Sequence, residues 1–256
     1  MSALTIAVSG VVGLAVGSFL TVVVHRVPAG ESIVAPGSRC PTCGTSVRAV
    51  DNVPVLSYLL RRGRCRSCGA PIGLRYPATE LATALVFCAV AARLASPWEV
   101  PAYCVLAAGL VALAAIDISH FRLPTPVILV TGAAGGLLLV LASAATHRWT
   151  ALLHAAVAGV ACFAVFALLY VVARRAMGYG DVRLAALCGT FLGWLSYRVA
   201  LVGVLLGIVA AGAAALALLA SGRAGRKTRL PFGPFLALGT VAAVLYGPAV
   251  ARVWLG

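Results

Sequence analysis

Long apolar stretches, separated by short polar segments, dominate the chain. Eight of them are nearly free of charged residues, at about 4–24, 78–95, 101–116, 126–145, 151–173, 182–195, 199–220 and 234–255. A helix that crosses a lipid bilayer needs roughly 17 to 25 mostly apolar residues. The pattern therefore predicts an all-α polytopic membrane protein with about eight transmembrane helices. The third and sixth stretches are short, and each adjoins an aspartate.

One sizeable polar segment interrupts the apolar pattern, at 26–76. It is rich in Arg, Gly, Pro, Ser and Cys, and we interpret it as a compact insertion between the first two membrane helices. The chain is therefore expected to divide into a first transmembrane helix at 1–25, the insertion at 26–76 and a membrane domain at 77–256.

The few charges that the chain carries indicate its orientation. Charged residues make up 10% of the chain, against roughly 25% in a soluble domain. If the stretches cross alternately, sixteen of the 20 Lys and Arg residues fall on one side, which the positive-inside rule assigns to the cytoplasm. This predicts a multi-pass protein of the cytoplasmic membrane, embedded in the lipid bilayer with both termini outside. A nucleic-acid partner is excluded, because so apolar a chain has little aqueous surface.

Four cysteines in the insertion form two CxxC pairs. Cys40 and Cys43 make the first pair, Cys65 and Cys68 make the second, and 21 residues separate the pairs. Two such turns supply the four thiolates of a tetrahedral zinc site. Disulfides and free thiols are the alternatives, and the predicted cytoplasmic location disfavours disulfides. Because four protein ligands leave no open coordination position, we expect the zinc to be structural.

The six carboxylates are few enough to consider one by one. Three lie away from the cytoplasmic ends of the predicted spans: Glu31, Asp51 and Glu99. The other three lie at those ends: Glu80, Asp117 and Asp181. Ionisable residues at membrane depth are costly and are usually functional, so these three are the candidate functional acids.

Asp117 and Asp181 form the most informative pair. Both are expected near one plane on the cytoplasmic side, on different helices, although spacing alone does not prove that they meet. Taken singly, Asp181 is equally well explained as a helix N-cap and Asp117 as a solvated loop residue. Together they suggest more, because two carboxyls held close cannot both ionise readily. One then keeps a proton and acts as an acid while the other activates water, which is an arrangement that hydrolyses an amide.

Several short motifs resemble those of the type IV prepilin leader peptidases, which are GxGD aspartic proteases, in the same order and over nearly the whole chain. The N-terminal motifs are Gly17-Ser18-Phe19-Leu20, His25-Arg26-Val27-Pro28, Asp51-Asn52-Val53-Pro54-Val55-Leu56-Ser57, Arg62-Gly63-Arg64-Cys65-Arg66, and Arg75-Tyr76-Pro77 with Glu80. The later motifs are Asp117 followed by Leu123-Pro124, then Gly178-Tyr179-Gly180-Asp181-Val182-Arg183-Leu184, then Pro231-Phe232-Gly233-Pro234-Phe235-Leu236-Ala237-Leu238-Gly239. Thr21 departs from the family pattern, which commonly has Asn there.

The resemblance implies an activity and the residues that perform it. Asp117 and Asp181 would be the catalytic pair of an aspartic peptidase domain at 77–256, with Gly178 and Gly180 letting the substrate backbone approach the second aspartate. The substrates would be prepilins or pseudopilins of type IV pilus or type II secretion systems. The enzyme would cut them after a Gly at the cytoplasmic membrane face.

The resemblance also implies a second activity. Many family members that carry the cysteine-bearing insertion methylate the new N-terminal amine using S-adenosylmethionine, and the same is expected here. The insertion would then be associated with the methyltransferase. The residues alone identify no pocket for the cofactor, and they do not indicate an oligomeric state.

Two other interpretations are compatible with parts of the pattern. One is a non-enzymatic membrane transporter or assembly component, with the zinc knuckle as a docking module and the aspartates lining an ion path. The other is a GxGD protease of another branch. The cysteine-bearing insertion and the Leu123-Pro124 spacing favour the prepilin branch.

Overall fold

The computed structural model is helical and describes residues 2–172, 177–222 and 230–254, apart from the side chains of 49 and 248–254. The basic segments at 174–175 and 223–229, which contribute to the predicted charge asymmetry, lie outside the described residues. Within the described ranges no residue forms a strand. The elements are α1 (Ala3–Arg26), η1 (Ala49–Asp51), α2 (Leu56–Leu60), α3 (Arg75–Arg93), α4 (Val100–His120), α5 (Thr125–Thr146), α6 (Trp149–Val172), α7 (Tyr179–Leu195), α8 (Tyr197–Ala220) and α9 (Gly233–Trp254).

Every predicted apolar stretch corresponds to a long helix, which confirms the all-helical fold class. Among the described residues, five helices are long and apolar enough to cross a membrane: α1, α4, α5, α6 and α8. The third stretch, predicted as short, belongs to α4, a helix of 21 residues that continues past its aspartate. The sixth stretch belongs to α7, which has 17 residues. The structure thus shows a multi-helix membrane protein.

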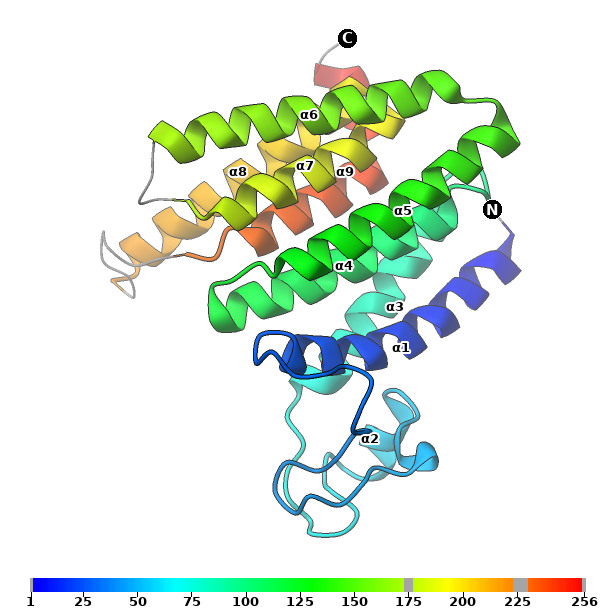
Figure 1. The fold of residues 1–256 in the computed structure, drawn as a ribbon, viewed down its shortest axis with the longest axis vertical. Helices are drawn as coiled ribbons and strands as arrows, with labels where there is room; N and C mark the ends of the chain where they lie inside the picture. Colours follow the sequence, from blue (N-terminus) through cyan, green and yellow to red (C-terminus); the bar gives the residue numbers. More distant parts are fainter. Residues whose placement is uncertain (1, 173–176, 223–229, 255–256) are drawn as a thin grey trace. The chain divides into compact units, whose positions relative to one another are not determined.

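The chain divides into two compact units, Met1–Ala92 and Arg93–Gly256, coloured blue to cyan and cyan to red in Figure 1. In the first unit, α1 and α3 are joined through glycines on one face of α1. A Cβ atom on Gly13 would lie 2.7 Å from the Cα of Ala84, and one on Gly17 would lie 2.6 Å from the Cα of Glu80. Small residues at this spacing let helix backbones approach closely, so α1 and α3 form the support of the insertion.

In the second unit, α7 is the central helix. It packs against α5, α6, α8 and α9, and much of its length is buried. On the α6 side, a Cβ atom on Gly189 would lie 2.6 Å from the Cys162 sulfur, and one on Gly193 would overlap Ala158. These two glycines, one helical turn apart, let α6 lie directly against α7.

Two helical hairpins accompany α7 in Figure 1. α4 and α5 pack against each other across a short turn, and α8 packs against α9. In the second hairpin a Cβ atom on Gly239 would lie 2.5 Å from the carbonyl oxygen of Gly203 and from the amide nitrogen of Gly207. Only glycine permits this approach, which fixes where the start of α9 lies beside α8.

Candidate active site and metal centre

Asp117 lies in the last turn of α4. The helix ends because Phe121 adopts a left-handed backbone (φ 52°), and the Phe121 N–H caps the helix on the Asp117 carbonyl at 2.9 Å. Asp117 is buried, with only 5% of the residue exposed. Its Oδ2 accepts the backbone N–H of Gly233, at 2.9 Å, so the start of α9 holds this carboxylate.

Asp181 lies in the first turn of α7. Gly178 is the N-cap, and its N–H donates to the Asp181 Oδ2 at 3.0 Å. This is the arrangement in which an acidic residue at the third helical position reaches back to the cap. Asp181 is 9% exposed. The alternative that Asp181 is the N-cap is therefore wrong, because Gly178 occupies that position and Asp181 is the third helical residue.

Leu123 connects the surroundings of the two aspartates. A Cβ atom on Gly180 would lie 2.8 Å from the Leu123 Cβ, and one on Gly233 would lie 3.1 Å from the Leu123 Cδ2. Leu123 thus fills the space between the α7 turn that carries Asp181 and the α9 start that binds Asp117. The structure therefore brings the predicted pair to one place.

Cations do not neutralise this pair among the residues that the structure describes. Its ion pairs involve other carboxylates. The nearest arginine in sequence, Arg183, instead donates to the Thr125 hydroxyl at the start of α5 and stacks 4.5 Å from the Tyr179 ring centre. Two buried carboxyls with interacting charges share a proton more readily than they both ionise. Such a pair holds one acid and one base for attack by water.

The two glycines before Asp181 differ in their surroundings. A Cβ atom on Gly178 would meet nothing closer than the Asp181 carboxylate, at 3.5 Å, so this position lies open. Gly180 faces Leu123, which leaves no space for a side chain. Packing against Leu123 thus explains why residue 180 is a glycine. The approach of a substrate backbone at Gly178 and Gly180 stays a prediction.

In the first unit, the two CxxC pairs form matching turns. In both, the N–H of the first cysteine donates to the carbonyl oxygen of the fifth residue after it, at 2.9 Å in the first turn and 2.8 Å in the second. The glycines that follow the pairs, Gly44 and Gly69, have left-handed φ angles of 69° and 71°. Glycine adopts this conformation without steric cost, which explains its place in both turns.

The four sulfurs of Cys40, Cys43, Cys65 and Cys68 converge. All lie within 4.8 Å of one another, and those of Cys40 and Cys68 are 3.9 Å apart. Zinc bound tetrahedrally by thiolates, with bonds of about 2.3 Å, separates its sulfurs by about 3.8 Å. The donor set and its spacing therefore fit a zinc ion.

The surroundings of the four thiols lower the pKa of three of them and raise the pKa of the fourth. Backbone N–H groups of the same turn lower the pKa of the Cys40 and Cys65 thiols, and the Thr45 hydroxyl and backbone lower that of Cys43. A backbone N–H also acts on Cys68, but desolvation and the three neighbouring thiols raise its pKa to about 11. A cation that binds all four sulfurs must displace the protons that the thiols carry, so its binding depends on pH.

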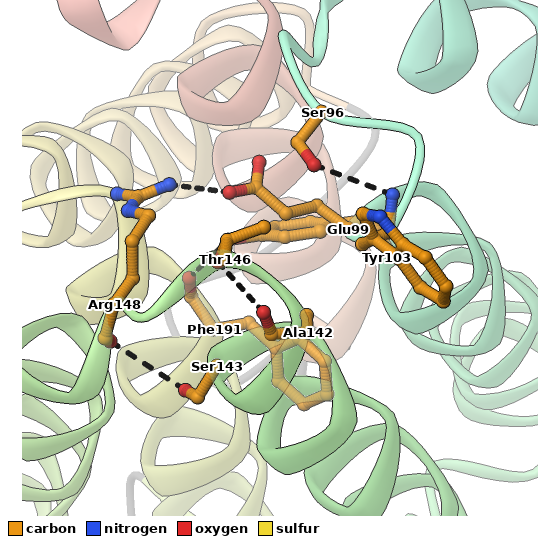
Figure 2. Close-up of polar contacts among 9 residues, drawn as sticks. Ser96, Glu99, Tyr103, Ala142, Ser143, Thr146, Arg148 and Phe191 are labelled. Atoms are coloured by element: carbon orange, nitrogen blue, oxygen red, sulfur yellow. Dashed lines mark hydrogen bonds and ion pairs between the residues drawn. The ribbon is translucent and has the colours of Figure 1, made fainter.

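A third buried carboxylate lies at the ends of α4 and α7 remote from the aspartate pair. Glu99 is 2% exposed and forms an ion pair with Arg148 (Figure 2). The Arg148 guanidinium also lies 5.5 Å from the centre of the Trp194 ring. The Tyr103 hydroxyl donates to the Phe191 carbonyl at 2.7 Å, and the two rings meet edge to face. These contacts tie the beginning of α4 to the end of α7.

Comparison with known proteins identifies the family. Residues 11–94 match the bacterial peptidase A24 N-terminal domain, and residues 104–220 match the type IV leader peptidase family. A prepilin leader peptidase/N-methyltransferase of Pseudomonas aeruginosa is 35% identical over 278 residues, which cover 95% of this chain and 91% of the relative. The chain belongs to the type IV leader peptidase family. No solved structure matches it.

Other relatives with the same name support the assignment. One from Burkholderia pseudomallei is 38% identical, over 93% of this chain and 84% of its own length. One from Myxococcus xanthus is 44% identical over 85% of this chain, but the match spans only 64% of that relative. The match to the leader peptidase family includes Asp117 and Asp181, and the match to the N-terminal domain includes the four cysteines.

Sequence reasoning missed several contacts within the second unit. Gly233 was recognised only as part of a motif, although its N–H holds Asp117. The sequence Pro231-Phe232-Gly233-Pro234, at the start of an apolar run, was the signal for a constrained backbone. Leu123 was likewise recognised only as part of the Leu123-Pro124 motif that follows Asp117. No sequence signal joined Glu99 to Arg148, because they lie 49 positions apart in the chain.

Proposed function

We propose that Asp117 and Asp181 are the catalytic pair of this prepilin leader peptidase. One observation carries the proposal: two buried carboxylates, from helices far apart in sequence, lie beside backbone segments that pack on the same leucine. Each keeps a backbone N–H on one oxygen. The transporter or assembly interpretation is not favoured, because the family assignment explains the same residues.

The pair performs peptide hydrolysis in two proton transfers. The ionised carboxylate takes a proton from water, and the oxygen of that water attacks the carbonyl carbon of the scissile bond. The protonated carboxyl polarises the carbonyl oxygen and then supplies the proton that the leaving nitrogen needs as the C–N bond breaks. The substrates are prepilins or pseudopilins, cut after a Gly that precedes an apolar helix.

The membrane arrangement follows the sequence prediction. Eight helices cross the cytoplasmic membrane, namely α1 and α3 to α9, with the insertion and the aspartate pair on the cytoplasmic side and both termini outside. Burial of α7 by its neighbours explains how a helix of 17 residues fits in such a bundle. The functional division into 1–25, 26–76 and 77–256 is retained, with the last part as the peptidase domain.

The four cysteines hold a structural zinc ion. The ion closes the two CxxC turns into one unit, in a segment whose secondary structure is limited to a short helix and a 3-10 turn. When Cys40→Ser is purified, we expect less bound zinc per chain by elemental analysis and earlier proteolysis of the insertion. Cys104→Ser, which changes a cysteine outside the insertion, is the control. Full zinc content in Cys40→Ser contradicts the four-thiolate site.

The second activity is N-methylation of the new N-terminus, with S-adenosylmethionine as methyl donor. Support comes from the names of the relatives and from the match of residues 11–94 to the N-terminal domain that contains the insertion. Cleavage and methylation would then act on one substrate in sequence, since the amine exists only after the bond is cut.

Mass spectrometry of a pilin N-terminus tests both activities. A prepilin is expressed in cells that lack their own leader peptidase, with this chain, with its Asp181→Asn variant or alone. The wild type should give a shortened pilin that carries one added methyl group, while Asp181→Asn should leave the precursor intact. Normal processing by Asp181→Asn contradicts the catalytic pair, and a cleaved but unmethylated product contradicts the second activity alone.

A further inference from the structure

A cleft of about 900 Å³ lies within the first compact unit. Its walls come from the last turns of α1, from the insertion and from the beginning of α3. The volume falls in the upper part of the roughly 300–1,000 Å³ range of small-molecule sites. None of its lining residues belongs to the unit that carries the aspartate pair, so the cleft is a separate site.

Glu80 places a buried carboxylate in the wall of this cleft. The residue is 8% exposed, and its Oε2 accepts the Val55 backbone N–H at 2.7 Å. The absence of a side chain at Gly17 lets α1 lie directly on the Glu80 backbone. The carboxylate is therefore fixed between α1, α3 and the insertion. A fixed, poorly solvated negative charge is a site for a cation.

Asp51 organises positive charge in the same cleft. Its side chain is 10% exposed and pairs with Arg61 and, at 3.5 Å, with Arg66. Both arginines line the cleft, and Arg66 remains half exposed. Because Asp51 holds them in place, their remaining N–H groups are available to a carboxylate, which arginine binds well.

Aromatic rings complete the lining. Tyr58 and Tyr76 both face the cleft. Gly63 has a left-handed φ of 66°, and a Cβ atom there would lie 2.8 Å from the Tyr58 hydroxyl oxygen, so the ring rests on the Gly63 backbone. A tyrosine held in this way offers a flat face on which a purine base can stack.

We propose that this cleft is the binding site of S-adenosylmethionine, an inference that rests on the methyltransferase part of the proposed function. The cofactor combines a sulfonium cation, a carboxylate and an adenine ring, and the cleft supplies a matching group for each. Glu80 would hold the sulfonium, the arginines fixed by Asp51 the carboxylate, and Tyr58 or Tyr76 the adenine. When bound, the cofactor supplies a methyl group that an amine can attack.

Two ligands that differ at the sulfur test the role of Glu80. S-adenosylhomocysteine has a neutral thioether where S-adenosylmethionine has the charged sulfonium. Isothermal titration of the full-length protein in nanodiscs should show about tenfold weaker binding of S-adenosylmethionine to Glu80→Gln, the loss of roughly one ion pair. Binding of S-adenosylhomocysteine should stay within about twofold. Glu31→Gln changes an exposed carboxylate outside the cleft and should bind both ligands as the wild type does.

Other outcomes of these binding measurements would overturn the proposal. Equal weakening of both ligands, or unchanged binding of both, overturns the assignment of Glu80 to the sulfonium. Prepilin cleavage by the same samples reports whether the protein is folded and whether the peptidase proposal holds. Cleavage without any binding of S-adenosylmethionine by the wild type overturns this inference and leaves the peptidase proposal intact.

A measurement on the wild type removes the dependence on variants. Ultraviolet cross-linking of radiolabelled S-adenosylmethionine, followed by peptide mapping, should place the label on peptides that contain Tyr58 or Tyr76. Excess unlabelled cofactor should abolish this labelling. Label found only on peptides from residues 93–256 overturns the assignment of the cleft.

Discussion

The two ends of the second compact unit each bury carboxylate, but they treat the charge in opposite ways. At one end Glu99 is 2% exposed and has the Arg148 guanidinium as its partner. At the other end Asp117 and Asp181 are 5% and 9% exposed, and within the described part of the chain their carboxylates accept backbone N–H groups and form no ion pair. Burial is similar, while the partners differ.

This difference separates structural from chemical use of a buried charge. A carboxylate next to a guanidinium serves as an anchor, because the ion pair ties the two segments that carry it. A carboxylate held near another carboxylate gains and loses its proton at modest cost, which is what a general acid or base requires. Substitutions at the two ends should therefore act on different quantities, stability at one and catalysis at the other.

Removal of either aspartate charge should have the largest effect, and on catalysis alone. Asp117→Asn and Asp181→Asn should each lower the rate of prepilin cleavage by about 1,000-fold or more, in the range of general acid–base contributions. Melting temperatures should not fall, since the amide oxygen still accepts the Gly233 or Gly178 N–H. Both quantities are measured on purified protein, with Glu31→Gln as the control. A fall in melting temperature that parallels the loss of rate would contradict the purely catalytic role of the aspartates.

Removal of the guanidinium should have the next largest effect, and on stability. Arg148→Leu leaves the Glu99 charge buried without its partner, and should lower the free energy of unfolding by about 3 kcal/mol. This is the lower end of the usual range, because the Arg148 side chain is 45% exposed. Unfolding in detergent measures the change, while kcat of the folded fraction should stay near normal. Arg198→Leu, an exposed cation at the start of α8, should change little.

Neutralising both partners should restore much of that loss. In the Glu99→Gln/Arg148→Leu double variant neither side chain of this pair is charged, so the free energy of unfolding should recover by about 2 kcal/mol relative to Arg148→Leu. The cycle of single and double variants measures the coupling between the two side chains. If the double variant is no more stable than Arg148→Leu, then Arg148 acts through its packing on Trp194 and not through the Glu99 charge.

The smallest effect is expected from a single hydroxyl. Tyr103→Phe removes the hydrogen bond to the Phe191 carbonyl and keeps the ring contact, which should cost about 1 kcal/mol. Tyr246→Phe is a matched control, because Tyr246 is 54% exposed and its ring contact with Arg93 is retained. Thermal melting measures both variants. An equal effect of the two substitutions would deny that the Tyr103 hydroxyl links α4 to α7.

Much of the fold was predictable because membrane helices leave a strong local signal. The apolar stretches located every long helix, and the scarcity of acids directed attention to Asp117 and Asp181. The two CxxC pairs predicted the cluster of four sulfurs, since each pair already brings two sulfurs together within one turn. In all three cases the information lies within a short window of sequence.

The partners of those residues were not predictable, because they are set by packing between distant segments. No local pattern shows that the Gly233 N–H holds Asp117 or that Arg148 neutralises Glu99. The length of α4 was also underestimated, because a buried aspartate continues the helix where a solvated one would have ended it. Helix existence follows from hydropathy, whereas the environment of each polar group follows from tertiary contacts.

The contact of Leu123 with two glycines makes three distant positions depend on one another in size. A larger residue at 180 fits only if the residue at 123 becomes smaller, and one at 233 needs in addition that the Asp117 carboxylate move, because its Oδ2 would lie 2.8 Å from the new Cβ atom. Natural variation at 123, 180 and 233 is therefore expected to be correlated, with a leucine accompanied by two glycines. A designer who wishes to alter the peptidase site must treat these three positions as a single unit of substitution.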